Sequence, residues 1–356
     1  MGQDSWKAAK EAFVTGHGGS SLADVAVVSM IVPLCVGLRL HLGSLTAGGR
    51  ARDTILDLAV VVAPIAVALT VGSDAAAPAC CALAAGVAAC RWWRGPRGAG
   101  ARVGGRATVR LFRVGGAVAT ATCILAVDFR CFPRRFAKTD RYGLSVMDLG
   151  SGVAVFGNAL SSRTARGAGR RGARAAPLAA LALARYAAVA LAAYPAPVAE
   201  YGAHWNFFAT LAVVEVLGDA LAGAALGGRR GAVVTCGAAV SAAVCACAAH
   251  ALVDGEYVLG DAPRDTFLSA NREGLASLPG YLAIWYAGLA LARPLHAALD
   301  RGSALPLAAV AAAALKGSEV LGPPSRRPVL ESITGKTAGL GYLQTPLPRS
   351  NRTRFA

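Results

Sequence analysis

The residues with the clearest capacity for chemistry lie between Asp128 and Gly150, in a polar stretch that separates two apolar runs. The side chains in it that could bind a ligand are Asp128, Phe132, Arg134, Arg135, Lys138, Tyr142 and Asp148. Guanidinium and ammonium groups bind anionic oxygens, the guanidinium fork being well matched to phosphate. The stretch therefore predicts a site for an anionic headgroup or cofactor. The alternative is a solvated basic loop that only sets membrane topology.

Two further polar stretches, 200–210 and 265–281, each lead into an apolar run. They supply the further site candidates His204, Trp205, Asn206, Asn271 and Glu273. Imidazole can transfer a proton near neutral pH, amides form hydrogen bonds, and tryptophan is enriched at membrane interfaces. The distribution of basic residues among the loops predicts that both stretches lie on the same membrane face as Asp128 and Lys138. We therefore expect the three stretches to form one site.

The composition is that of a membrane protein. Of the 356 residues, 55% are hydrophobic and the mean hydropathy is +0.49, which is too apolar for an ordinary soluble domain. The formal net charge of +16 could suggest nucleic acid, but the basic residues occupy short loops between apolar runs, where they orient membrane proteins. The sequence therefore predicts an all-α, polytopic transmembrane helical bundle with no nucleic-acid partner.

The hydropathy pattern predicts about nine or ten spans. Apolar runs occupy residues 23–40, 54–72, 76–91, 111–127, 144–161, 177–197, 205–226, 231–253, 277–299 and 304–322. They divide the chain into an N-terminal amphipathic segment (1–22), a transmembrane domain (23–322) and a polar C-terminal tail (323–356). Arginines concentrate after the odd-numbered runs, so those loops are predicted to be cytoplasmic and the N-terminus lumenal or external. The basic loop after the fourth run breaks this rule, which favours a ligand site there.

Cysteine spacing and the charges inside the runs add two expectations. The nine cysteines lack zinc-ligand spacing and mostly lie in apolar runs, so we predict neither a metal site nor a disulfide framework. Ionisable residues inside the predicted spans, where each needs a partner or a place in the bundle interior, include Asp148, Arg185, Glu215 and Asp219. Arg185 paired with Asp148 or Glu215 would be a structural arrangement.

Four ordered motifs resemble a known family. They read D-F-x-x-F-P-R-R-F-A-K-T at 128–139, Y-G-x-S-x-M-D-L-G at 142–150, E-Y-G-x-H-W-N-F-F-x-T at 200–210 and S-A-N-R-E-G-L-x-S-L-P-G-Y at 269–281. The F-V-T-G-H-G-G-S-S segment near the N-terminus is a weaker match. The chain is similar here to the glucosaminyl-phosphatidylinositol inositol acyltransferases of glycosylphosphatidylinositol (GPI) anchor synthesis, the PIG-W type.

The resemblance implies a multi-pass enzyme of the endoplasmic reticulum membrane. It would transfer a fatty acyl group, usually palmitoyl, from the co-substrate acyl-CoA to the inositol ring of glucosaminyl-phosphatidylinositol, on the lumenal face. The family pattern implicates Asp128 and Lys138 in catalysis. A carboxylate can take the hydroxyl proton and an ammonium can polarise the thioester. His204 is the rival base, and Arg134 and Arg135 would bind CoA or lipid phosphates.

Two other readings remain open from the sequence. One is a lipid transporter or scramblase that uses the basic loop to capture anionic lipid, although no convincing internal repeat is present. The other is a non-catalytic membrane subunit of a GPI-synthesis complex. Members of the family are generally longer than this chain, so part of an acyl pocket could come from helices that this sequence does not contain. An acyl-CoA-dependent product separates the enzyme from both rivals.

Overall fold

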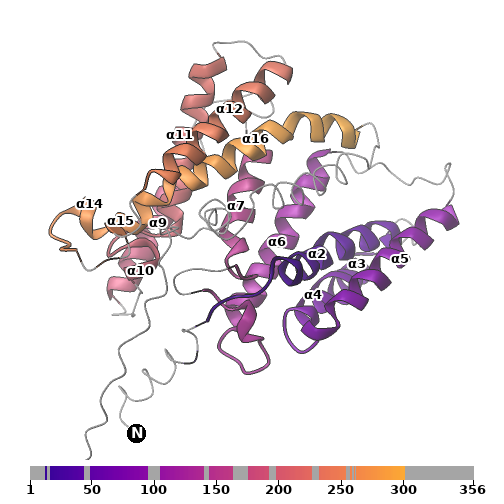
Figure 1. The fold of residues 1–356 in the computed structure, drawn as a ribbon. Coiled ribbons are helices and arrows are strands. Elements are labelled where there is room, and N and C mark those ends of the chain that lie inside the picture. Colours follow the sequence, from indigo (N-terminus) through magenta and orange to yellow (C-terminus); the bar gives the residue numbers. More distant parts are fainter. Residues whose placement is uncertain are drawn as a thin grey trace, which may run out of the picture.

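A computed structural model gives the fold shown in Figure 1. The residues that it describes are 13, 17–43, 49–94, 105–139, 144–162, 175–191, 198–226, 232–253, 257–258, 260 and 262–300. Every structural statement below concerns these residues. Tyr142, the tenth apolar run, the C-terminal tail and most of the N-terminal segment lie outside them.

The described part of the chain is helical and contains no strand. The principal helices are α2 (Leu22–Gly43), α3 (Arg50–Asp57), α4 (Ala63–Ala68), α5 (Ala76–Arg94), α6 (Gly105–Ala126), α7 (Leu149–Leu160), α9 (Ala175–Leu191), α11 (Phe207–Leu226), α12 (Ala232–Ala251) and α16 (Leu278–Asp300). A π-helical turn, Leu58–Val62, joins α3 to α4. Each of the first nine predicted runs overlaps a helix. The all-α fold class is therefore confirmed.

In the described part of the chain, four helices are long and apolar enough to cross a bilayer: Leu22–Leu42, Ser73–Cys90, Thr108–Ala126 and Arg272–Ala297. This supports a multi-pass membrane protein, and the total of nine or ten spans stays a prediction. Some of the predicted runs contain shorter helices. The helix α7, for example, has 12 residues, which extend about 18 Å at 1.5 Å per residue and fall short of a hydrocarbon core about 30 Å thick.

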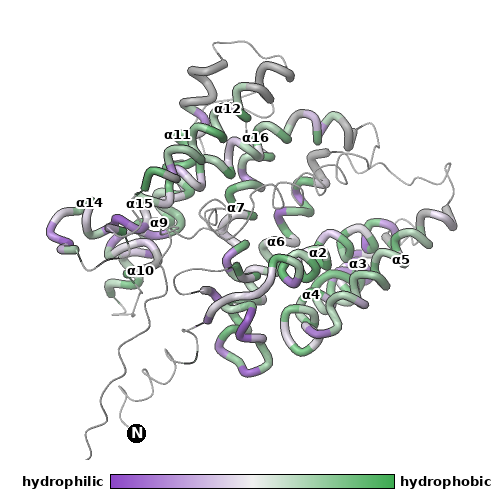
Figure 2. Tube along the Cα trace, in the orientation of Figure 1, coloured by the Kyte–Doolittle hydropathy of each residue, from purple (hydrophilic) through white to green (hydrophobic). Residues whose placement is uncertain are grey.

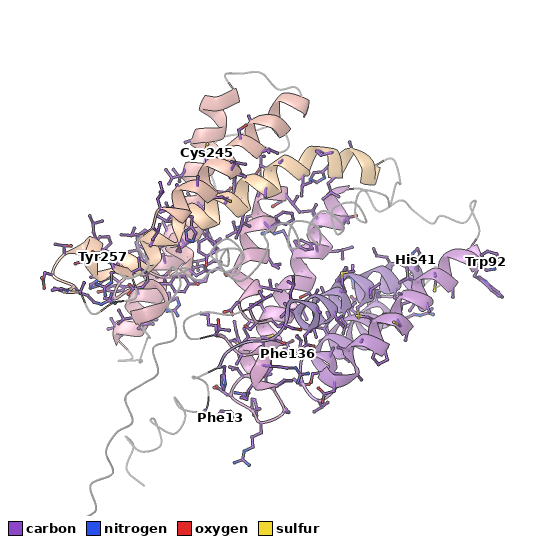
Figure 3. All side chains as sticks on the ribbon, in the orientation of Figure 1. Phe13, His41, Trp92, Phe136, Cys245 and Tyr257 are labelled. Carbon is purple, nitrogen blue, oxygen red and sulfur yellow. The ribbon has the colours of Figure 1, made fainter. Side chains whose placement is uncertain are left out.

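The N-terminal helices α2 to α5 pack beside α6 on one side of the molecule (Figure 1). Along α2, the buried residues Val28, Ile31 and Cys35 recur at helical spacing and form one apolar stripe. Small residues let the helices approach closely, since a Cβ on Gly115 of α6 would lie 2.6 Å from Val32 of α2. The far end of α5 carries Trp92, which is exposed and lies away from this packing (Figure 3).

The C-terminal helices pack around α16, which crosses the molecule diagonally in Figure 1. Tyr281, Trp285 and Leu289 occupy successive turns of α16 and are almost fully buried against α7, α11 and α12. Glycine again permits close contact, because a Cβ on Gly218 of α11 would lie 2.8 Å from the Trp285 ring. The helices α6 and α7 contact each other and connect the two groups.

Polar segments gather where these helices end. Figure 2 shows hydrophilic chain in the loop after α6 and around the short helices α14 (Phe267–Ala270) and α15 (Arg272–Ala276). The short helix α10 (Val198–Tyr201) lies at the same end, in contact with α15. The predicted polar stretches therefore lie at helix termini, where backbone groups lack intrahelical partners and polar side chains can satisfy them.

Candidate active site

Aromatic anchors hold the loop that follows α6. Phe132 and Phe136 are 1% and 0% exposed, and both insert into the apolar core of the N-terminal helices. Their rings pack edge to face, with centroids 6.4 Å apart. Figure 3 shows Phe136 at this end of the molecule, with Phe13 below it. Phe132, predicted as a substrate contact, is therefore observed as an anchor that fixes the loop to the bundle.

Arg134 closes the same loop by binding backbone. Its guanidinium donates hydrogen bonds to the carbonyls of Val127, Phe129 and Phe132 at 3.0 to 3.1 Å, and to that of Phe13 at 3.3 Å. It also lies 4.3 Å from the centroid of the Phe13 ring. The burial that accompanies these contacts lowers the pKa of Arg134. This side chain satisfies carbonyls just beyond the end of α6, and its role in phosphate binding stays a prediction.

Arg135 links the loop to the N-terminal helices. It forms ion pairs with Asp24 at 3.1 Å and Asp74 at 2.7 Å, and donates a hydrogen bond to Ser73 at 3.3 Å. The hydrogen bond with Asp74 is the largest cause of the raised pKa of Arg135. Because two carboxylates already neutralise this cation, binding of a phosphate by Arg135 also stays a prediction.

The two predicted catalytic residues lie at opposite ends of the loop. Asp128 is exposed immediately after α6 and interacts electrostatically with Arg134. Lys138 is half-buried, and its ammonium lies 5.7 Å from the centroid of the Tyr201 ring. A cation at this distance over an aromatic face is attracted to it. Lys138 thus connects the first polar stretch to the second.

Asp148 fixes the backbone next to Lys138. This carboxylate is 2% exposed and accepts hydrogen bonds from the hydroxyls of Ser145 at 2.8 Å and Thr139 at 3.1 Å. Arg185 is exposed on α9, and its pairing with Asp148 or Glu215 stays a prediction. Asp148 therefore holds Thr139, the residue directly after Lys138, by a hydrogen bond inside the protein.

A tight turn of the N-terminal segment packs against Thr139 and Leu144, next to Asp148. Gly19 has a φ of +83°, and a Cβ there would lie 2.5 Å from the Leu144 carbonyl and 2.7 Å from the Thr139 methyl group. The backbone N–H of Ser20 donates to the same Leu144 carbonyl at 2.7 Å. Only glycine combines this backbone conformation with so close an approach. The weakest of the sequence motifs is thus part of the same assembly.

Three hydroxyl groups that we did not predict meet beside Lys138. The Tyr281 hydroxyl hydrogen-bonds with Tyr201 and Ser151, and Lys138 lies within electrostatic range of it. Tyr281 is 0% exposed. A signal for the tyrosines was present, because Tyr201 and Tyr281 each belong to a polar motif next to an apolar run. Their mutual contact was not predictable, since 80 residues separate them in the chain.

Asn271 organises the stretch that contains His204. Its side-chain oxygen accepts hydrogen bonds from the backbone N–H groups of His204 at 2.8 Å and Trp205 at 2.9 Å, and its amide nitrogen donates to the Phe267 carbonyl at 2.8 Å. Gly202, with φ +103°, lies against Asn271 so closely that a Cβ would collide with its backbone. Asn271 is thus the point where the second and third stretches join.

We expect Asn271→Ala to lower the free energy of unfolding by about 1 to 3 kcal/mol, because two backbone N–H groups lose their acceptor. Thermal unfolding of the detergent-purified protein measures the loss. The matched control is Asn158→Ala, which removes a half-buried asparagine that accepts one hydrogen bond from Arg113. Equal losses in the two variants would contradict the role assigned to Asn271.

The remaining residues of the second stretch have distinct environments. The His204 side chain is exposed. The centroid of its ring lies 5.8 Å from that of Tyr186 and 6.3 Å from that of Phe267. The Trp205 indole donates to the Thr210 hydroxyl at 2.9 Å. Asn206 is 6% exposed, caps the start of α11 through its side-chain oxygen, and donates to the Ala182 carbonyl of α9 at 3.0 Å. His204 is therefore accessible, while Trp205 and Asn206 hold the helix start.

Glu273 and its neighbour Arg272 hold the segment that precedes α14. Glu273 is 2% exposed and accepts two hydrogen bonds from the Arg264 guanidinium. One is to Oε1, and the other is to Oε2 at 3.1 Å. The hydrogen bond with Glu273 is the largest cause of the raised pKa of Arg264. Arg272 donates to the carbonyls of Val258, Gly260 and Ala262. Glu273 is therefore observed in an ion pair, and its contact with substrate stays a prediction.

The three polar stretches thus meet at one end of the bundle, as expected. Lys138 contacts the second stretch through Tyr201, Asn271 joins the second to the third, and Tyr281 of the third returns to Tyr201. The meeting point offers the Lys138 ammonium and the hydroxyl groups of Tyr201 and Tyr281. Asp128, at the other end of the first stretch, and His204, in the second, add an exposed carboxylate and an exposed imidazole. Such a set can stabilise an oxyanion and accept a proton, which are the requirements of acyl transfer.

Comparison with known proteins gives a consistent result. The family model for GWT1 matches residues 6–319. A GPI-anchored wall transfer protein 1 from Emericella nidulans is 32% identical over 324 residues, covering 80% of this chain and 67% of the relative. The glucosaminyl-phosphatidylinositol-acyltransferase PIGW of Bos taurus is 35% identical over 196 residues, or 51% of this chain and 38% of that protein.

An uncharacterized protein of Arabidopsis thaliana is 37% identical over 201 residues, covering 52% of this chain. The aligned parts span 42% of the plant relative and 38% of the bovine one, so this chain matches less than half of their length. The family model, in contrast, covers the whole described region, including every residue around Lys138 that is named above. The chain belongs to the GWT1 family.

Proposed function

We propose that this protein transfers a fatty acyl group from acyl-CoA to the inositol ring of glucosaminyl-phosphatidylinositol in GPI-anchor biosynthesis. Membership of the GWT1 family and the name of the bovine relative support this reaction. The structural observation that carries the proposal is the position of Lys138, which lies beside Tyr201 where three polar stretches converge at one end of an apolar bundle. A lipid headgroup can reach such a place from the membrane.

The proposed chemistry is direct transfer in a ternary complex. A base takes the proton of an inositol hydroxyl, and the hydroxyl oxygen bonds to the thioester carbonyl carbon. The carbon–sulfur bond then breaks, and the protonated base returns the proton to the leaving thiolate, so that CoA departs as its thiol. The Lys138 ammonium stabilises the negative charge on the carbonyl oxygen during the attack. Asp128 is the proposed base, and the exposed imidazole of His204 is its rival.

A covalent acyl-enzyme is a weaker alternative. Ser145 follows the motif that contains Lys138 and has an acidic partner, because its hydroxyl donates to Asp148 at 2.8 Å. It is, however, 0% exposed. A nucleophilic serine needs a base that accepts its proton and space for the acyl group. Cys131 is exposed in the loop after α6, beside Arg134. Direct transfer requires neither residue.

The proposed location is the endoplasmic reticulum membrane, with the site on the lumenal face. Four helices of spanning length support membrane insertion. The arginine-rich loops that the sequence assigns to the cytoplasm follow α5 and α7, at helix ends other than those that carry the site. Palmitoyl-CoA and glucosaminyl-phosphatidylinositol are the proposed co-substrate and acceptor, and other membrane lipids surround the bundle.

The test is acyl transfer in membranes from cells that lack their own inositol acyltransferase and express this chain. We expect inositol-acylated glucosaminyl-phosphatidylinositol to form when palmitoyl-CoA is added and not when it is omitted. Membranes from the same cells with an empty vector are the control. No product from membranes that contain the folded chain would overturn the enzyme proposal. Movement of glucosaminyl-phosphatidylinositol between leaflets without acylation would instead support a scramblase.

A further inference from the structure

Tyr281 places a hydroxyl group inside the bundle, at the point where the ends of three helices meet. It lies in the first turn of α16 and is 0% exposed. Its hydroxyl hydrogen-bonds with Ser151, in the first turn of α7, and with Tyr201, the last residue of α10. A buried phenol hydroxyl needs such partners, because leaving it unbonded would be unfavourable.

Aromatic packing restricts the same group of side chains. The Phe207 ring lies with its centroid 6.3 Å from that of Tyr201 and 6.0 Å from that of Tyr281, tilted by 45° and 56°. These separations lie in the range of favourable aromatic pairs. The Tyr201 ring is therefore held on one side by Phe207 and at its hydroxyl by Tyr281. The Tyr201 ring also faces the Lys138 ammonium, which lies 5.7 Å from the ring centroid.

We propose that Tyr281 is a positioning residue of the acyl-transfer site, whose hydroxyl holds the Tyr201 ring and thereby sets the place of the Lys138 ammonium. The inference rests on the proposed function of Lys138. Tyr281 itself is too deeply buried to touch substrate, so its effect passes through Tyr201. Positioning of this kind has large effects on rate, because a displacement of about 1 Å at a reacting group can slow a reaction 100-fold.

The chain offers a matched control on the same helix. Tyr286 is 2% exposed, and its hydroxyl approaches the Gly218 carbonyl at 3.5 Å, away from Lys138. Tyr281→Phe and Tyr286→Phe each remove one buried hydroxyl from α16 and preserve the ring. We expect Tyr281→Phe to lower kcat for acyl transfer about tenfold with KM for palmitoyl-CoA unchanged, and Tyr286→Phe to alter neither.

A double-mutant cycle separates positioning from a general effect on the fold. Tyr201→Phe removes the other end of the hydrogen bond, so the double variant Tyr201→Phe/Tyr281→Phe should be no slower than the slower single variant. Ser151→Ala provides a second test, because it removes a partner of Tyr281 from α7 without changing either tyrosine. We expect Ser151→Ala to lower kcat in the same direction. Thermal unfolding of each detergent-purified variant reports any loss of folded protein.

The outcomes distinguish this inference from the proposed function. Wild-type protein that makes acylated product, with Tyr281→Phe and Ser151→Ala both at the wild-type rate, would overturn the positioning role alone. Equal losses of kcat in Tyr281→Phe and Tyr286→Phe, each matched by a loss of thermal stability, would also overturn it. Wild-type protein that makes no product would overturn the proposed function, and the inference with it.

Discussion

Lys138→Ala is expected to lower the rate of acyl transfer by about 100- to 1,000-fold, the usual effect of removing one group that stabilises an oxyanion. The protein should still fold, because Lys138 is only half-buried and lies in the loop after α6, outside the apolar core of the bundle. The measurement is the initial rate of product formation in membranes, at matched expression and saturating palmitoyl-CoA. A rate within a few-fold of wild type would contradict the assignment.

Lys138→Arg makes this test sharper. The chain contains 31 arginines and only five lysines, so its basic loops are built almost entirely from arginine. Arginine keeps the positive charge and the attraction to the Tyr201 ring, but its planar fork spreads the charge and needs more space. We expect Lys138→Arg to be nearly as slow as Lys138→Ala. Full activity in Lys138→Arg would mean that charge alone suffices at this position.

Arg272→Met is expected to lower the free energy of unfolding by about 3 to 5 kcal/mol, since it removes one partner of a buried ionic group. Arg272 is 4% exposed, lies 3.7 Å from Glu273, and donates to three carbonyls between Val258 and Ala262. Methionine fills similar space without replacing any of these donors. The midpoint temperature of thermal unfolding in detergent should therefore fall by several degrees. The segment before α14 should also become more sensitive to protease.

Arg113→Met is the control for that prediction. Arg113 is an exposed arginine of α6 that donates to Asn158 at 3.0 Å and Ser161 at 3.4 Å. Exposed side chains of this kind contribute little, so its replacement should change stability by less than about 1 kcal/mol. A loss in Arg272→Met no larger than in Arg113→Met would show that the segment before α14 does not depend on the buried arginine.

Much of the architecture follows from local patterns. Apolar runs predict helices in a membrane protein because backbone groups in lipid must be satisfied within their own segment. The length of each helix was less predictable, since hydropathy does not show where a run such as 144–161 begins its helix. Asp148 precedes α7 and bonds to Thr139 and Ser145, which shortens the helix to Leu149–Leu160. The bond to Thr139 joins the run to the polar stretch before it, which hydropathy within the run does not show.

The candidate site was also predictable from the sequence in one respect and not in another. The sequence alone determined that Asp128, Lys138 and His204 belong to polar motifs next to membrane helices, because charge is costly in lipid and concentrates at helix ends. Only the tertiary structure decided what each side chain contacts. Arg134 binds carbonyls beside α6, and Tyr281 reaches Tyr201. A motif records residue type and spacing along one segment, whereas these contacts join helix ends that are distant in sequence and meet only when the bundle packs.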